Sequence, residues 1–221
     1  MPRTWVIVPM FNEATVIGGV IAGLLAEFNF IVCVDDGSSD DSVRVARDAG
    51  AHVVSHPINL GQGASLQTGF EFALSDPLMT EVVTFDADGQ HLVADAVGMV
   101  AKLRDEDLDI VVGSRFLDDR TTVGFAKRMV LRSAARYTAI TTGMALTDAH
   151  NGLRAIGRGL LENIHLKQNR MAHASELIDQ IGGNKAKWAE FPTHIVYTDY
   201  SKSKGQSLLN SVNILVELLF R

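Results

Sequence analysis

The sequence predicts an α/β domain built on a mostly parallel central sheet. Apolar runs of strand length alternate with helical stretches from the N-terminus onward. These runs are continuously apolar, which is typical of strands that helices cover on both faces. The chain has 221 residues, 47% of them hydrophobic, and is therefore long enough to bury a large core. Ligands of such sheets bind at the carboxyl ends of the strands.

The first half of the chain follows a regular β-α-β order. In the first helical stretch, Val16, Val20 and Leu24 share one stripe. The predicted strands are 5–8, 30–34, 51–55, 81–85 and 108–112. The predicted helices are 14–28, a helix through 49 that Asp40 or Asp41 caps, 61–74 and 92–103.

The pattern is looser after Gly113. The sequence predicts a helix at about 125–142, then a polar turn at 148–152, then short elements. We find no internal repeat, low-complexity tract or clear linker. A single domain over residues 1–221 is therefore expected.

Composition excludes several classes of protein. The net charge of −6 argues against general nucleic-acid binding, which usually requires a basic face. Cys33 is the one cysteine, and its apolar surroundings favour a packing role in a reducing compartment. No apolar stretch is long enough to cross a bilayer unaided, and the N-terminus lacks the pattern of a signal peptide.

The most informative motif follows the strand predicted at 81–85. Asp86 and Asp88 lie one residue apart, so in an extended segment they point the same way, with Gln90 next in phase. Carboxylate oxygens in this arrangement suit Mg²⁺ or Mn²⁺, which usually also binds substrate phosphates. The structural alternative is a polar turn that ends a strand.

Two other strands also end in polar clusters. The residues at 9–13 and 35–40 lie where an α/β sheet binds ligands, and their carboxylates can accept hydrogen bonds from a base or ribose. Helix starts and turns are the alternative explanation. Gly61 and Gly63 lie at the start of the helix predicted at 61–74, where they permit close approach of the backbone to a phosphate or ribose, or simply a tight turn.

A row of arginines lies on the helix predicted after Gly124. Arg128, Arg132 and Arg136 are spaced by four residues and share one helical face. Such a row is often a solvated surface. Three like charges repel, however, unless an anion faces them, so an anion-binding role is favoured.

Taken together, these motifs resemble those of one known family. The segments that carry the resemblance are 6–13, 34–40, 59–64, 86–91, 113–116 and 148–154. Their order is similar to that of family-2 inverting glycosyltransferases, whose GT-A fold is a Rossmann-like nucleotide-diphospho-sugar transferase domain. The dolichyl- and polyprenyl-phosphate sugar synthases are the most similar branch. The Gln-x-x-Arg-Trp motif of processive polysaccharide synthases is absent.

The resemblance assigns expected roles to particular residues. It implies a metal site for Mg²⁺ or Mn²⁺ at Asp86, Asp88 and Gln90, and catalytic roles for Asp88, Arg115 and Asp148. It implies a substrate-binding set of Pro9, Phe11, Glu13, Asp36, Gly61, Gly63, Asp86, Arg128, Arg132, Lys202 and Lys204. Residues 1–115 would form the nucleotide-sugar side and residues 116–206 the acceptor side.

Within the acceptor side, the resemblance implies that Arg115, with Arg128 or Arg132, faces a lipid phosphate. Lys202 or Lys204 would lie in a loop that closes over the donor. The expected reaction is metal-dependent transfer of a sugar, with inversion, from a nucleoside diphosphate sugar to a polyprenyl phosphate. Neither the sugar nor the nucleotide base follows from these motifs.

Other functions stay open at this point. They are a glycosyltransferase acting directly on a growing cell-surface glycan, a sugar nucleotidyltransferase, and a non-catalytic nucleotide-sugar-binding subunit.

A hydroxyl acceptor would require a carboxylate base, for which Asp148 is the first candidate and Glu176 the second. His91 and His150 are further candidates for a ligand or base, although a structural role is the usual one for such histidines. Glu176 by default is a solvent-facing residue of a helix.

The C-terminal residues suggest a contact with a membrane. Residues 207–221 form an amphipathic helix pattern with a broad apolar stripe. The branch usually carries C-terminal membrane spans, and this sequence has none. We therefore expect a cytoplasmic protein at the inner face of the membrane, docked through this helix on lipid or on a small integral membrane protein. Packing of the helix on its own domain is the alternative.

Overall fold

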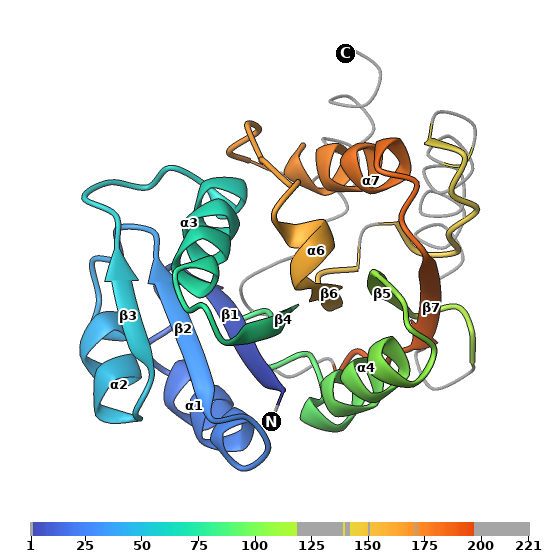
Figure 1. The fold of residues 1–221 in the computed structure, drawn as a ribbon. Helices are drawn as coiled ribbons and strands as arrows, with labels where there is room; N and C mark the ends of the chain where they lie inside the picture. The colour runs from blue at the N-terminus through green and yellow to red at the C-terminus, as the bar shows by residue number, and fades with distance from the viewer. Residues whose placement is uncertain (1, 119–138, 140–141, 150, 171, 197–221) are drawn as a thin grey trace.

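The computed structural model describes residues 2–118, 139, 142–149, 151–170 and 172–196. Within them a seven-stranded sheet has the order β3-β2-β1-β4-β6-β5-β7 (Figure 1). The strands are β1 (Arg3–Met10), β2 (Phe30–Asp35), β3 (His52–Ser55), β4 (Met79–Thr84), β5 (Ile110–Ser114), β6 (Arg154–Gly157) and β7 (Trp188–Pro192). The helices are α1 (Ile17–Leu25), α2 (Ser42–Asp48), α3 (Gln62–Leu74), α4 (Val93–Asp105), α6 (Arg158–Leu161) and α7 (His173–Gly183).

The predicted mostly parallel sheet is confirmed. β1 pairs in parallel with β2 and β4, β2 with β3, and β5 with β7. The exception is β6, which runs antiparallel to both of its neighbours, β4 and β5. This strand and β7 were not predicted as strands, because each has only four or five residues and lies in the loosely patterned second half.

Helices cover both faces of the sheet (Figure 1). Along β1, Trp5 and Ile7 pack into a core with α3, α6 and α7, whereas Val6 and Val8 pack into a core with α1, α2 and α4. This alternation follows from the two-residue period of a strand. A sheet buried on both faces explains why its strands are continuously apolar.

The predicted helices and strands of the first half all form, with ends shifted by a few residues. The N-cap of α2 is Asp41, which makes no side-chain cap hydrogen bond, whereas the preceding Asp40 accepts the Ser42 N–H through Oδ1 at 3.0 Å. Gly61 precedes α3 with a φ of 107°, a conformation that strains any other residue. Most of the helix predicted at 125–142, and all of 207–221, lie outside the described residues.

Two further expectations concern burial. Cys33 is fully buried, and this burial raises the pKa of its thiol to about 12, in agreement with a packing role. In the described part of the chain, no helix combines the length and the apolar character needed to cross a bilayer.

Close packing of α3 on β1 depends on Gly69. A Cβ added at this position would lie 2.2 Å from Cγ2 of Ile7, far inside van der Waals contact. The helix that begins at the cavity described below thus packs directly on β1. This contact lies in the second half of the helix and sets how closely the helix approaches the strand.

We predict that Gly69→Ala lowers the free energy of unfolding by about 1–3 kcal/mol, the usual cost of overpacking a core. Alanine has a higher helix propensity than glycine, and this effect must be separated from packing. Gly19→Ala in α1 is the matched control, because an added Cβ there meets nothing within 4 Å. The control should stabilise by about 0.5–1 kcal/mol. Urea unfolding of both variants measures the difference, and equal effects would contradict the packing argument.

Candidate active site

A cavity of about 370 Å³ lies at the carboxyl ends of β1, β2 and β4. Its walls are formed by Pro9, Met10, Phe11, Glu13, Asp36, Asn59, Gly61, Gln62, Ser65, Asp86, Ala87 and Asp88. Most of the side chains that the sequence predicted for donor and metal binding are therefore brought together here. Gly63 and Gln90 are not part of this wall.

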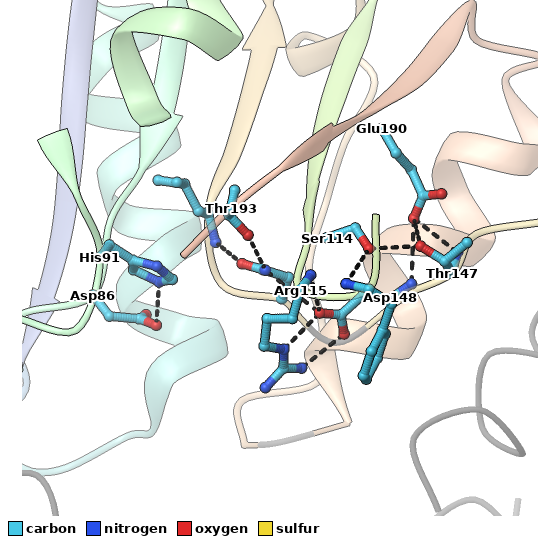
Figure 2. Close-up of polar contacts among 11 residues, drawn as sticks. Asp86, His91, Ser114, Arg115, Thr147, Asp148, Glu190 and Thr193 are labelled. Atoms are coloured by element: carbon cyan, nitrogen blue, oxygen red, sulfur yellow. Dashed lines mark hydrogen bonds and ion pairs between the residues drawn. The ribbon is translucent and has the colours of Figure 1, made fainter. Parts of the chain in front are cut away.

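Asp86 is held in place by two side chains. Figure 2 shows the contact between the Asp86 carboxylate and the ring of the buried His91. Oδ2 of Asp86 lies 2.8 Å from Nε2 of His91, and Oδ1 accepts a hydrogen bond from the Gln62 amide at 3.3 Å. The ring of His91 packs edge-on against Phe85. His91 therefore orients a proposed metal ligand, as residues that hydrogen-bond to metal ligands usually do.

The backbone of Gly152 packs directly against the same carboxylate. A Cβ at this position would lie 2.4 Å from Oδ2 of Asp86. Gly152 is itself held by Thr84, whose hydroxyl donates to the Gly152 carbonyl at 2.6 Å. Gly152, the last residue of the predicted polar turn, thus packs against one side of Asp86.

The electrostatics of Asp86 and Asp88 suit a cation. Burial, and then the charge of Asp86, raise the pKa of Asp88 to about 6. Burial also acts to raise the pKa of Asp86, but His91 and Arg154 outweigh it and the pKa is lowered. Two mutually repelling carboxylates with hard oxygens in one cavity wall fit Mg²⁺ or Mn²⁺.

The described residues supply few other metal ligands. Among them, no group of three or more His, Cys, Asp and Glu side chains is arranged to hold a metal ion. Gln90 is buried and lies outside the cavity wall. The backbone N–H of Gln90 donates to Oδ1 of Asp88 at 3.0 Å. A cation at Asp86 and Asp88 would therefore take further ligands from a diphosphate.

Asp36 has partners within the protein itself. Its carboxylate accepts backbone N–H groups from Leu60 at 2.9 Å and Gly61 at 2.7 Å, and Oδ1 lies 2.9 Å from Nδ1 of His56. The residue is only 4% exposed. Asp36 thus fastens the glycine turn to the end of β2, in addition to lining the cavity.

The two glycines make room for another segment of the chain. Added Cβ atoms at Gly61 and Gly63 would lie 2.2 Å from the carbonyl oxygen of Asn169 and 2.0 Å from that of Gln168. The Gly63 N–H donates to Asn169 at 2.8 Å. The predicted close approach of the backbone is therefore made to another segment of the chain, and the N–H groups of Gly61 and Gly63 already donate to Asp36 and Asn169.

Glu176 also differs from its expected position. It lies in the first turn of α7, where its carboxylate accepts the backbone N–H groups of Lys167 at 3.0 Å and Gln168 at 2.8 Å. The prediction that Glu176 lies in the middle of a helix is therefore wrong, and its half-buried carboxylate has backbone partners. Glu176 holds the segment that packs on the glycine turn.

On the acceptor side, Arg115 and Asp148 form an ion pair (Figure 2). Nε and Nη2 of Arg115 donate to the two oxygens of Asp148 at 2.6 and 2.7 Å. The side chains are 12% and 1% exposed. Asp148 is thus engaged as the buried counter-ion of Arg115, and service as a base for a hydroxyl acceptor would require this ion pair to break.

Sequence reasoning missed Glu190 on β7. Its carboxylate accepts the Thr147 N–H at 2.7 Å, the Thr147 hydroxyl at 2.9 Å and the Asp148 N–H at 3.2 Å (Figure 2). Burial raises the pKa of this carboxyl. Glu190 therefore fixes the backbone that carries Asp148. The feature of the sequence that could have indicated Glu190 is its position as a charged residue within a short, mostly apolar run.

Several predicted residues lie outside the described part of the chain. They are Arg128, Arg132, Arg136, His150, Lys202 and Lys204. Their roles stay predictions.

Comparison with known proteins identifies the class. Residues 5–164 match the glycosyl transferase family 2, so the chain belongs to this family. An uncharacterized protein of Methanocaldococcus jannaschii is 34% identical over 223 residues, covering 98% of this chain and 91% of the relative.

Two relatives have named activities. The UDP-N-acetylglucosamine–dolichyl-phosphate N-acetylglucosaminyltransferase of Methanococcus voltae is 26% identical, covering 97% of this chain and 94% of the relative. An undecaprenyl-phosphate 4-deoxy-4-formamido-L-arabinose transferase of Enterobacter sp. is 30% identical, covering 97% of this chain and 65% of the relative.

A solved structure supports the fold. Glucosyl-3-phosphoglycerate synthase from Mycobacterium tuberculosis, in complex with Mn²⁺, uridine diphosphate and phosphoglyceric acid, is similar with a TM-score of 0.72 and 18% identity. The similarity covers 99% of this chain and 78% of that chain. The expected glycosyltransferase fold is thereby confirmed.

We predict that Gly152→Ala weakens Mn²⁺ binding by about 10–100-fold, the range for residues that orient a metal ligand. The added methyl group displaces Asp86 while every charge is kept. Isothermal titration with Mn²⁺ measures the effect. Gly159→Ala in α6 is the control, because its Cβ meets nothing within 4 Å. Unchanged Mn²⁺ affinity in Gly152→Ala would contradict the assignment.

A second prediction concerns the buried ion pair. Asp148→Asn leaves the Arg115 cation without its counter-ion, so we expect a loss of about 3 kcal/mol in unfolding free energy. Adding Arg115→Met should recover much of this loss. Glu162→Gln, which breaks the exposed Arg158 pair, should cost under about 1 kcal/mol. A stable but inactive Asp148→Asn variant would instead favour the role of a base.

Proposed function

We propose that this glycosyltransferase moves a sugar, with inversion, from a nucleoside diphosphate sugar to a polyprenyl phosphate. The observation that carries the proposal is the pair Asp86 and Asp88 in the wall of the cavity at the strand ends. The lipid-phosphate acceptor is supported by the names of the two relatives that act on dolichyl phosphate and undecaprenyl phosphate.

In this proposal the donor lies along the 370 Å³ cavity. Phe11, 43% exposed, offers an aromatic surface at the nucleoside end. Asp86 and Asp88 bind Mg²⁺ or Mn²⁺ together with the diphosphate, as the manganese and uridine diphosphate complex of the similar structure also suggests. When bound, the ion neutralises the charge that grows on the leaving diphosphate.

The acceptor needs orientation more than deprotonation. A phosphate monoester has a second pKa near 6, so at neutral pH it is largely dianionic. One of its oxygens attacks the anomeric carbon while the bond from that carbon to the diphosphate oxygen breaks. The proposed acceptor site comprises Arg115, Arg128 and Arg132, because guanidinium groups match phosphate oxygens. Lys202 or Lys204 is proposed to close over the donor.

The polyprenyl tail stays in the bilayer, so the enzyme is proposed to work at the cytoplasmic surface of a membrane. Residues 207–221 are the proposed contact, with lipid or with a small integral membrane protein. Flotation with anionic liposomes, with and without these residues, tests this part separately from catalysis.

The function is tested by incubating the protein with labelled nucleotide sugars, Mn²⁺ and polyprenyl phosphate, and measuring label in the organic phase. We expect Asp88→Asn to lower transfer by about 100-fold or more, because a neutral amide is a poor ligand for a hard cation. Asp105→Asn, at an exposed position at the end of α4, should leave transfer unchanged. Label found only in water-soluble glycan would overturn the lipid acceptor, and full transfer in excess chelator would overturn the metal site.

A further inference from the structure

A second, smaller cavity adjoins the first. It has a volume of about 140 Å³ and shares Pro9, Gln62 and Asp86 with the wall of the larger cavity. On its far side lie Gly152, Arg154 and His173. Asp86, a proposed ligand of the diphosphate-bound cation, therefore lies at the junction of the two cavities.

Arg154 contributes a buried cation to this second cavity. It lies on β6 opposite Thr84, is 2% exposed, and its Nε has no hydrogen-bond acceptor among the described residues. Burial lowers the pKa of its guanidinium to about 10, so the group is charged at neutral pH. A buried charge with an unused N–H is costly unless a ligand or water accepts from it.

His173 contributes an acceptor. Its Nδ1 lies 2.7 Å from the carbonyl oxygen of Arg170, which can only accept, so the proton is on Nδ1. Burial lowers the pKa of the ring to about 4, and the imidazole is neutral at neutral pH. Its Nε2 is therefore an unprotonated acceptor on a residue that lines the cavity.

A donor and an acceptor together fit hydroxyl groups. A hydroxyl accepts from Arg154 and donates to His173 at the same time, whereas a phosphate would face the lone pair of His173 and the carboxylate of Asp86. In a nucleoside diphosphate sugar, the sugar follows the diphosphate. With the diphosphate at Asp86, the sugar reaches the neighbouring cavity.

We infer that the second cavity receives the transferred sugar, and that Arg154 and His173 determine sugar specificity by hydrogen bonding to its hydroxyl groups. This inference rests on the proposed nucleotide-sugar donor. It is independent of the acceptor. The substrate class it assigns is a neutral sugar with hydroxyl groups on the edge that faces β6 and α7.

Calorimetric binding tests the inference without turnover. The probes are UDP- and GDP-sugars, and UDP and GDP without a sugar, each with Mn²⁺. His173→Asn keeps a donor near Nδ1 for the Arg170 carbonyl and removes Nε2. We expect the Kd for the nucleotide sugar to rise about ten-fold, while that for the nucleoside diphosphate changes by less than about two-fold.

Arg154→Lys is the second variant, because it keeps the charge and removes the planar set of donors. It should show the same selective loss. A donor that lacks the hydroxyl bound by His173 should bind wild type and His173→Asn equally. His52→Asn, on β3 away from both cavities, is the control for a histidine-to-asparagine change.

The outcomes separate the two proposals. Equal weakening of nucleotide sugar and nucleoside diphosphate, or no weakening of either, in variants with wild-type thermal unfolding would overturn the sugar site. A wild-type protein that binds nucleotide sugars no better than nucleoside diphosphates would overturn it as well. Selective weakening without any transfer to polyprenyl phosphate would keep the sugar site and overturn the proposed acceptor.

Discussion

The contact between Asp86 and its surroundings is the constraint on which the rest of the site depends. His91 and Gln62 bond to the two oxygens of its carboxylate, and the Gly152 backbone lies too close for any side chain. These contacts join the end of β4 to the first turn of α3 and to the turn before β6. The geometry of a cation bound there is therefore set by three separate segments of the chain, each of which the sheet positions.

Charges of opposite sign alternate behind this carboxylate. Burial lowers the pKa of Arg154, and the charges of Asp86 and Asp148 partly offset this effect. Asp148 is in turn paired with Arg115. Each buried charge thus has an opposite charge close by, which offsets much of the cost of removing it from water. The same alternation couples the cation site to the acceptor side, because a change at one charge alters the field at the next.

The sequence was sufficient for the first half of the fold, where apolar runs and helical stripes are local properties. It was insufficient where a role depends on partners distant in the chain. The carboxylate of Glu190 binds the backbone of Thr147, which is distant in the sequence. The first residue of β6 is Arg154, a buried cation that is stabilised by the charges of Asp86 and Asp148, and only folding brings these carboxylates near it. The same is true of the glycine turn. The sequence predicted that another group lies close to the backbone of Gly63, but it did not show that this group is the backbone of Gln168.

The pairing of Asp148 with Arg115 also bears on the acceptor. A sugar hydroxyl has a high pKa and needs a carboxylate that takes its proton during attack. Asp148 is buried and gives both oxygens to Arg115, so using it as a base would break the ion pair and leave a buried cation uncompensated. A phosphate that is already anionic avoids this cost, because its charge can add to the field of the arginine without any proton transfer. The energetics of this one ion pair therefore favour a phosphate over a hydroxyl as the nucleophile.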